Sequence, residues 1–549
     1  MKLQNLIHIL IGFVCIGSLP RAQAVVPPPG GGYPNFTTAA GDHALQALTS
    51  GLGNTAIGTF SLFTVTTGSF NTAVGAGSLD LNTADSNTAT GAAALLFNTI
   101  GTENTANGTA ALELNSTGSN NTANGAFALF SNTTGSENTA IGVEALFSNS
   151  TGVDNTATGF RALMSNTGVE NTANGSSALQ SNTIGEGNTA VGSQALSLNT
   201  QGSGNTATGG SALFANTTGN QNTANGDEAL FANTTGAQNT ATGSAALISN
   251  TSGFGNTANG FQALLNNSTG NYNTATGFFA LQSNTTGDIN VATGQQALIH
   301  NTTGDENVAV GASALFNNIA GADNIAIGFG ALLNNTGSGN VALGTLAGAN
   351  LTTGNSNIVI GNLLGGVAGE ANTMRIGLSQ FRTFISGIRG VTTGNANAIA
   401  VMIDSDGQLG TMSSSRRFKH EIKAMDTASQ AILSLKPVTF NYKSDNTNTP
   451  QFGLIAEDVA AVNPDLVVRD ENSQIYTVRY DAVNAMLLNE FLKEHRKVEA
   501  QQKQIDALTT RLERQAMLIQ KVSAQLEVSK FATGRIRRGG PALQVVNKP

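Results

Sequence analysis

The sequence predicts a mainly β protein: a trimeric parallel β-roll or β-solenoid shaft, then a small α+β domain and a C-terminal coiled coil. Three observations predict this fold class. A short phrase of fixed period fills most of the first 366 residues, glycine and asparagine punctuate it every few residues, and a late segment spaces apolar residues by three and four. With 65 glycines, no tryptophan and 11% charged residues in 549, the composition is typical of a repeat array rather than of a globular enzyme.

The repeat occupies residues 37–366 and has the form N-T-A-x-G-x-x-A-L-x-x-N-T-T-G. Seventeen residues cannot hold a helical hairpin, so each unit is predicted to be one β-coil with tight turns, stacked on the next. Because side chains alternate along a strand, Asn and Ala should share the inner face, with Thr and the variable residue on the other. The first asparagine of the phrase recurs at steps of 17, sometimes 16, at positions 54, 71, 87, 104, 121, 138, 155, 171, 188, 205, 222, 239, 256, 273, 290, 307, 324, 340 and 357.

The last units make the second strand face fully apolar, as in Asn324-Ile325-Ala326-Ile327 and Asn357-Ile358-Val359-Ile360. An apolar flat face needs a cover, and the same face of identical chains around a three-fold axis supplies one. We therefore expect a homotrimer. A monomeric coil that leaves this face exposed is the alternative.

The N-terminus has the features of a signal peptide over residues 1–24. Lys2 precedes an apolar run from Leu6 to Leu19, and Ala22-Gln23-Ala24 offers small residues for cleavage. A Pro/Gly linker follows at 25–36. The single cysteine, Cys15, lies inside the apolar run, so a mature chain would hold no disulfide and no cysteine-ligated metal. No segment has the length of a spanning helix, and we expect a secreted or cell-surface protein without a transmembrane helix.

Charge divides the chain in two. Residues 25–373 carry seventeen acidic side chains and one basic side chain, Arg161, within a net charge of −8 for the whole sequence. Nucleic acid and anionic lipid require clustered Lys and Arg, so we expect no nucleic-acid partner. After residue 373 bases outnumber acids by 23 to 17, which indicates a part with a different task.

The C-terminal third begins with a β-rich neck at 367–412 and becomes globular in composition at residues 413–497. Residues 481–530 are predicted to form a coiled coil, or alternatively one amphipathic helix packed on its own domain, and residues 531–549 a flexible basic tail. The predicted seam consists of Leu487, Phe491, Val498, Ile505, Leu508, Leu512, Ile519, Val522 and Leu526, interrupted by Glu494, Gln501 and Gln515.

Two resemblances add to this. The phrase in residues 37–361 resembles the head repeats of trimeric autotransporter adhesins, which implies a left-handed β-roll in trimers. Four phrases of the C-terminal module are similar to the intramolecular chaperone and auto-processing domain of endosialidase-type tail spikes: Ser413 to Ile422, Ile432 to Tyr442, Phe452 to Val459 and Tyr476 to Asp481. That resemblance implies a domain that trimerises, nucleates folding of the upstream β-structure and cuts itself off.

The resemblance also implies the catalytic pair, a serine and a lysine five residues later, here Ser414 and Lys419. A lysine that loses its proton can deprotonate a nearby serine, which then attacks an adjoining carbonyl. Spacing of five places the two on different faces of a helix or strand, so they could meet only across a turn or between chains. The family usually has aspartate after the serine, whereas this chain has Ser415.

We expect an adhesin-like fibre that binds a host or cell-surface receptor and needs no cofactor or metal. His420 and His495 have no partner at ligand spacing. Any enzymatic activity would be a single self-cleavage by a serine-lysine endopeptidase. Two alternatives stay open: a module that chaperones without cutting, and an ice-binding or passive spacer protein whose outward threonines order water.

Overall fold

The computed structural model describes residues 34–380, 382–385, 388, 398–404, 407–470 and 472–533. The predicted signal peptide, Cys15, most of the linker and the tail beyond residue 533 lie outside the described residues. The chain divides into two compact units, residues 1–383 and 384–549, and each is described by itself.

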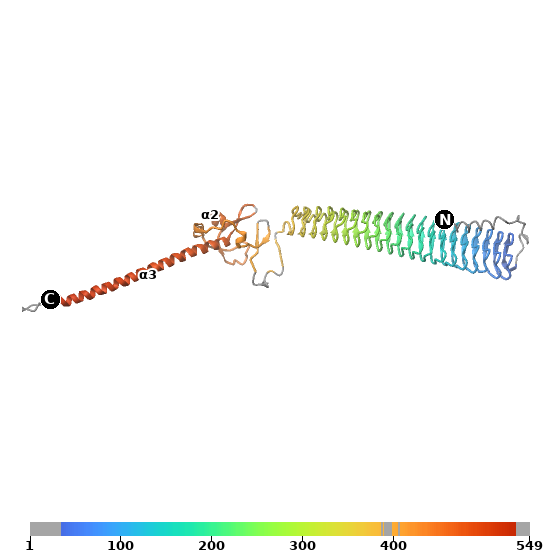
Figure 1. Ribbon diagram of the computed structural model, residues 1–549. Coiled ribbons are helices and arrows are strands. Elements are labelled where there is room, and N and C mark those ends of the chain that lie inside the picture. Colours follow the sequence, from blue (N-terminus) through green and yellow to red (C-terminus); the bar gives the residue numbers. More distant parts are fainter. Residues whose placement is uncertain are drawn as a thin grey trace, which may run out of the picture. The chain divides into compact units, whose positions relative to one another are not determined.

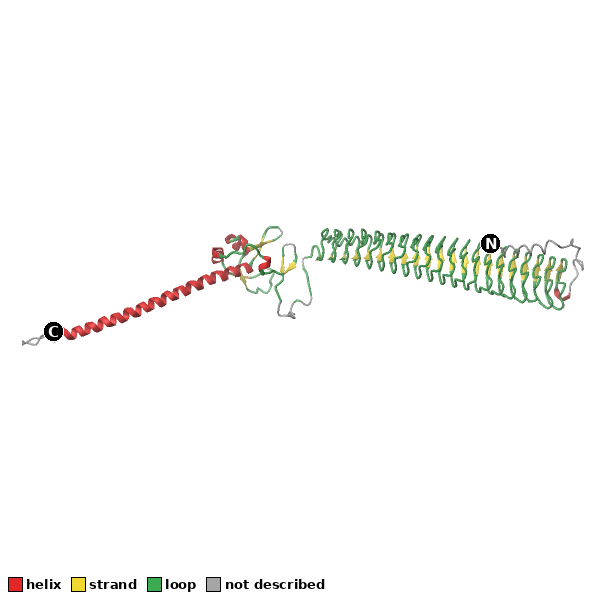
Figure 2. Cartoon of the chain, viewed as in Figure 1, coloured by secondary structure: helices red, strands yellow, loops and turns green. Residues whose placement is uncertain are grey.

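The first unit is a parallel β-solenoid (Figures 1 and 2). After a short 3-10 turn, η1 (Pro34–Phe36), twenty-one three-residue strands form one sheet, each pairing in parallel with the next along the chain. The prediction of a mainly β chain with a parallel solenoid is confirmed. The strands are β1 (Thr38–Ala40), β2 (Thr55–Ile57), β3 (Thr72–Val74), β4 (Thr88–Thr90), β5 (Thr105–Asn107), β6 (Thr122–Asn124), β7 (Thr139–Ile141), β8 (Thr156–Thr158), β9 (Thr172–Asn174), β10 (Thr189–Val191), β11 (Thr206–Thr208), β12 (Thr223–Asn225), β13 (Thr240–Thr242), β14 (Thr257–Asn259), β15 (Thr274–Thr276), β16 (Val291–Thr293), β17 (Val308–Val310), β18 (Ile325–Ile327), β19 (Val341–Leu343), β20 (Ile358–Ile360) and β21 (Met374–Ile376).

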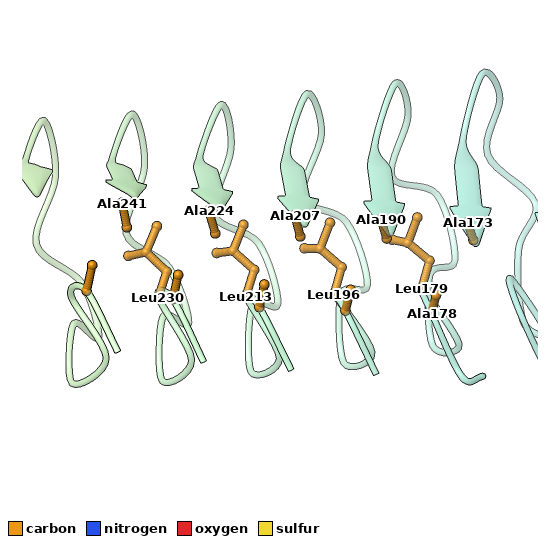
Figure 3. Close-up of a cluster of buried hydrophobic side chains, with 14 of the residues drawn as sticks. Ala173, Ala178, Leu179, Ala190, Leu196, Ala207, Leu213, Ala224, Leu230 and Ala241 are labelled. Atoms are coloured by element: carbon orange, nitrogen blue, oxygen red, sulfur yellow. The ribbon is translucent and has the colours of Figure 1, made fainter. Parts of the chain in front are cut away.

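The apolar core is a column of small and branched side chains along the inside of the coils. In most repeats the strand Ala and the Ala-Leu pair after the turn are buried, for example Ala207, Ala212 and Leu213, all fully enclosed. Figure 3 shows the strand alanines pointing at the leucines, coil after coil. The inward placement of Asn and Ala predicted from strand alternation is therefore correct.

Two ladders of buried asparagine run beside this core. In the first ladder, Oδ1 of Asn188 accepts hydrogen bonds from the backbone N and the Nδ2 of Asn205, at 3.0 and 3.1 Å. Nδ2 of Asn205 also donates to the Gly219 carbonyl at 2.9 Å. In the second ladder, Nδ2 of Asn216 donates to Oδ1 of Asn199 at 2.7 Å. Along the unbroken ladders the buried amides thus have partners in their own and adjacent coils, which offsets the cost of burying them.

Close stacking explains the invariable glycine after each strand. Gly209 has φ +133°, and a Cβ atom there would lie 2.4 Å from the carbonyl oxygen of Gly226 in the next coil. A side chain would separate the coils. The turn that follows also uses left-handed backbone at a buried leucine, as at Leu213 with φ 53°, which is unusual for a residue with a branched side chain.

Three steps of the repeat are 16 residues long and they alter the ladders. In each, the first-ladder asparagine donates to the second-ladder asparagine five residues earlier, as from Asn340 Nδ2 to Asn335 Oδ1 at 3.1 Å. In the last short step, Asn335 Nδ2 lies 3.4 Å from Asn324 Oδ1, and Oδ1 of Asn318 is buried with no hydrogen-bond partner. The second ladder is therefore broken between Asn318 and Asn335.

The sheet continues past residue 366, where the repeated phrase ends. β21 pairs with β20 in parallel, and Arg375 of β21 forms an ion pair with Glu370 at 2.8 Å. Glu370 also accepts from the Val367 amide at 2.9 Å, and its carbonyl accepts from Asn357 Nδ2 at 2.9 Å. This segment closes the C-terminal end of the first asparagine ladder.

Replacing one ladder amide should destabilise the shaft. Asn205→Ala leaves the Asn222 backbone amide without its acceptor and removes one of two donors from both Asn188 Oδ1 and the Gly219 carbonyl, a loss of about 2 kcal/mol since a buried unpaired group costs ~1–3 kcal/mol. Urea unfolding should show it as a lower midpoint. The exposed Asn225 of β12 is the control, and an equal effect of Asn225→Ala would contradict the ladder's role.

Two acidic side chains lie half-buried on the solenoid, each just after a core leucine. Burial raises the pKa of Glu113 to about 7 and that of Asp80 to about 6. The folded chain therefore binds these protons more tightly than the unfolded chain does. Protonation of these two carboxyl groups contributes its full stabilisation at pH values below the ordinary carboxyl pKa. The contribution is lost as the pH rises through the raised pKa values, about 6 for Asp80 and about 7 for Glu113.

Glu113→Gln should therefore raise the melting temperature at pH 8 and leave it unchanged at pH 4.5. The amide stays neutral at both values, whereas ionised Glu113 must be buried at pH 8. Glu137, exposed at a turn, is the matched control for the same substitution. An equal gain at both pH values would show that charge burial is not the cause.

The second unit is a small mixed region of short hairpins and helices. Its apolar cluster contains Val459, Leu466, Val467, Val478 and Met486, with Met425, Ile432 and Leu435 packed against it. The elements are β22 (Met402–Ile403), β23 (Leu409–Gly410), η2 (Arg416–Phe418), η3 (Asp426–Ser434), β24 (Val438–Phe440), β25 (Gln451–Gly453), α2 (Ala456–Val462), η4 (Pro464–Leu466), β26 (Val467–Arg469), β27 (Ile475–Val478) and α3 (Tyr480–Thr533). β22 and β23, β24 and β25, and β26 and β27 pair antiparallel.

Within the described residues, no helix combines the length and the apolar character needed to cross a membrane. The 54 residues of α3 include many charged and amide side chains.

Candidate functional site

Ser414 and Lys419 flank a single 3-10 turn, η2. The Phe418 amide donates to the Ser415 carbonyl and the Lys419 amide to the Arg416 carbonyl, both at 3.1 Å. The backbone is extended on either side of this turn, at Ser415 and at Lys419. A turn therefore lies between Ser414 and Lys419. The spacing of the pair allows contact either across a turn or between chains, and this arrangement corresponds to the first.

The turn does not bring the two side chains together. Ser414 and Lys419 are both exposed, and in the described part of the chain no hydrogen bond joins them. The nearby polar contact is from the Ser415 amide to Ser413 Oγ at 3.3 Å. In the single chain Lys419 is therefore not placed to act on Ser414.

Apolar side chains surround the pair and face solvent. Phe418, between the two residues, is 64% exposed and is covered on one side by the Arg417 guanidinium, 4.7 Å from the ring centre. Met412 and Ile422 are also exposed. Exposed apolar groups of this size around a polar pair mark a surface suited to burial against another chain.

A second polar cluster, which the sequence analysis did not identify, joins η3 to the first turns of α3. Ser429 is fully buried, and its Oγ lies 2.5 Å from Glu490 Oε1, 2.7 Å from Asn489 Nδ2 and 3.2 Å from Lys493 Nζ. Lys493 Nζ also lies 2.5 Å from Glu490 Oε1 and 2.5 Å from the Asp426 carbonyl oxygen. Hydrogen bonds from Lys493 and then Ser429 hold the pKa of Glu490 below its usual value. We call Ser429, Asn489, Glu490 and Lys493 the η3–α3 cluster.

Helix α3 has two different faces. Met486, Glu490 and Lys493 follow one another by three or four residues on the face that contacts η3 and the apolar cluster. The predicted seam, beginning Leu487 and Phe491, lies roughly 100° around the helix from that face, because successive residues of an α-helix turn by that angle. Phe491 is 65% exposed, and every seam residue from Leu487 to Leu526 is exposed. The prediction of a long helix is confirmed, whereas its pairing in a coiled coil stays a prediction.

Within the described residues, no group of three or more His, Cys, Asp or Glu side chains could hold a metal ion.

Comparison with protein families matches residues 414–468 to the family described as chaperone of endosialidase. The match begins at Ser414 and includes η2, η3, β24, β25, α2 and η4. It confirms the predicted resemblance of this module, which follows a solenoid of about twenty coils. No curated protein and no solved structure matches the chain.

Proposed function

We propose, from the chaperone-of-endosialidase segment at residues 414–468, that the chain forms a secreted or surface trimeric fibre with an adhesin-like role. Its C-terminal module acts as a trimerising intramolecular chaperone and cuts itself off through Ser414 and Lys419. The observation that carries the proposal is the exposed apolar seam along α3, which a single chain leaves entirely in water.

The outward strand face of the solenoid supports assembly. From β1 to β20 its outward positions carry Thr, Asn, Val, Ile, Leu and Ala and no charged residue, whereas the turns carry the acids. In β18, Ile325 and Ile327 are 39% and 40% exposed. A flat, uncharged face that becomes apolar toward the C-terminal module fits the same face of two further copies.

The cleavage follows from burying the pair. Removing water from Lys419 favours its neutral amine, which takes the proton of the Ser414 hydroxyl. The serine oxygen attacks an adjoining carbonyl, the C–N bond breaks, and the lysine returns the proton to the leaving amine. Water then hydrolyses the ester. Because the single chain keeps both residues exposed and apart, the cut would await assembly.

A second candidate function, ice binding, is favoured by one feature. The strands β4 to β15 each present an outward threonine, and in many of them it is exposed, as at Thr88, Thr105 and Thr122. Interruption of the second outward position by Asn, Ile and Val weakens this array. Thermal hysteresis of the purified chain would support it, and its absence would exclude it.

Light scattering tests the trimer: the chain from residue 25 should have three times its own mass. Ile325→Asp with Ile327→Asp should shift it toward monomer, because six like charges would be buried without partners. Ile319→Asp, an exposed isoleucine in a turn, is the matched control. A monomeric wild-type chain at micromolar concentration would contradict the trimer, and an unaffected double variant would contradict the use of this face.

A further inference from the structure

The η3–α3 cluster holds the carboxyl end of the segment that carries Ser414 and Lys419. Asp426 begins η3 seven residues after Lys419, and its carbonyl accepts from Lys493 Nζ at 2.5 Å and from Asn489 Nδ2 at 3.3 Å. Met425, the residue before it, packs on the apolar cluster. Between Phe418 and Met425 the chain has no strand or helix, so this attachment is what fixes the segment to α3.

The cluster is not a second nucleophile. Ser429 Oγ is fully buried, so no peptide bond from outside can approach it. Lys493 Nζ is already engaged by Glu490, Ser429 Oγ and the Asp426 carbonyl, so its donors serve contacts within the cluster. The cluster instead fixes η3 relative to the first turns of α3, two elements about sixty residues apart in sequence.

We propose that Ser429, Glu490 and Lys493 form a latch that fixes the Ser414–Met425 segment to α3, so that assembly along the seam of α3 positions the Ser-Lys pair for cleavage. The inference rests on the proposed self-cleavage. The latch and the seam occupy different faces of one rigid helix, so the seam can contact other copies while the latch stays closed. The three residues are positioning residues, since none contacts Ser414 or Lys419.

The test uses the full chain and two substitutions that open the latch, Lys493→Met and Ser429→Ala. Lys497→Met is the matched control: Lys497 lies one turn further along α3, pairs only with Glu494 at 3.4 Å, and has no contact with η3. Lys493→Arg keeps the charge and the donors and should restore function. The readouts are the rate of self-cleavage, the assembly mass, and trypsin nicking after Arg417, Lys419 and Lys423, located by mass spectrometry.

Opening the latch should slow self-cleavage and speed nicking of the segment by roughly tenfold each, with the assembly mass unchanged, because a buried network loses its partners. Lys497→Met should behave as wild type, and Lys493→Arg should recover most of the cleavage rate. Unchanged cleavage and nicking in both latch variants would overturn the inference and leave the proposed function intact. If the wild-type chain never cuts itself, the proposed cleavage fails, and nicking alone then decides whether the latch holds the segment.

Discussion

Ser414→Ala should leave the chain whole, whereas wild type should be cut at a bond adjoining Ser414 and release the C-terminal fragment. The substitution removes the attacking oxygen and nothing else, since the exposed Ser414 side chain makes no contact on which the fold depends. Lys419→Ala should also stop the cut, because no base then activates the serine. Both variants should still assemble. Intact-mass measurement over time follows the reaction.

The neighbouring residues supply the controls. Ser413 and Ser415 flank the proposed nucleophile, and Lys423 is a second exposed lysine in the same segment. Ser413→Ala, Ser415→Ala and Lys423→Ala should all cut at near wild-type rates. If Ser414→Ala still yields the fragment, or if all three serine variants lose activity equally, the assignment to this dyad is wrong.

Removing residues 414–549 should cause the shaft to aggregate. The truncated shaft keeps its sheet but lacks the module proposed to align three chains. Its uncharged strand face and its terminal strands should then associate with other chains in no defined arrangement. Size-exclusion chromatography coupled to light scattering should show a broad distribution of large masses.

A deletion of nearly equal size separates this effect from mere loss of chain. Removing residues 105–239 joins Asn104 to Thr240 and takes out whole coils, so the repeated phrase and the C-terminal module both stay intact. This shorter shaft should remain soluble and assemble as wild type does. A soluble, well-defined assembly of the chain ending at residue 413 would contradict the chaperone role.

Periodicity alone predicted the solenoid and the inward asparagines, because the two-residue alternation of a strand leaves one choice of buried face. It could not predict the left-handed leucines such as Leu213: nothing in leucine's own preferences favours that backbone, and it is the stacking of the next coil that stabilises it. It also could not find the η3–α3 cluster. Ser429 and Lys493 are 64 residues apart and form no motif, and one hint was that polar residues follow Met486 on a stripe of α3 that is otherwise apolar.

For the Ser-Lys pair, a resemblance in the sequence identified the two residues, and the family match starts at Ser414 itself. Under the proposed assembly, the distance between the two side chains would depend on contacts with other copies, which one sequence does not specify. The turn η2 between Ser414 and Lys419 is a local feature, whereas the cover over Phe418 and Ile422 would come from other copies.

The broken second ladder has a mechanical consequence. A force along the shaft loads all the interfaces between coils in series, so each interface bears the same force. Within one interface the hydrogen bonds share that force. The shaft should therefore break at an interface that has lost hydrogen bonds. Along the second ladder, from Asn82 to Asn335, the interface that lacks its ladder bond lies between the coils of Asn318 and Asn335, where Asn318 Oδ1 has no partner, while coils such as those of Asn199 and Asn216 keep the bond. In a single-molecule stretching experiment, rupture within this ladder region should therefore start near residues 318–335, close to the C-terminal end of the solenoid, and leave the coils of the region toward its other end folded.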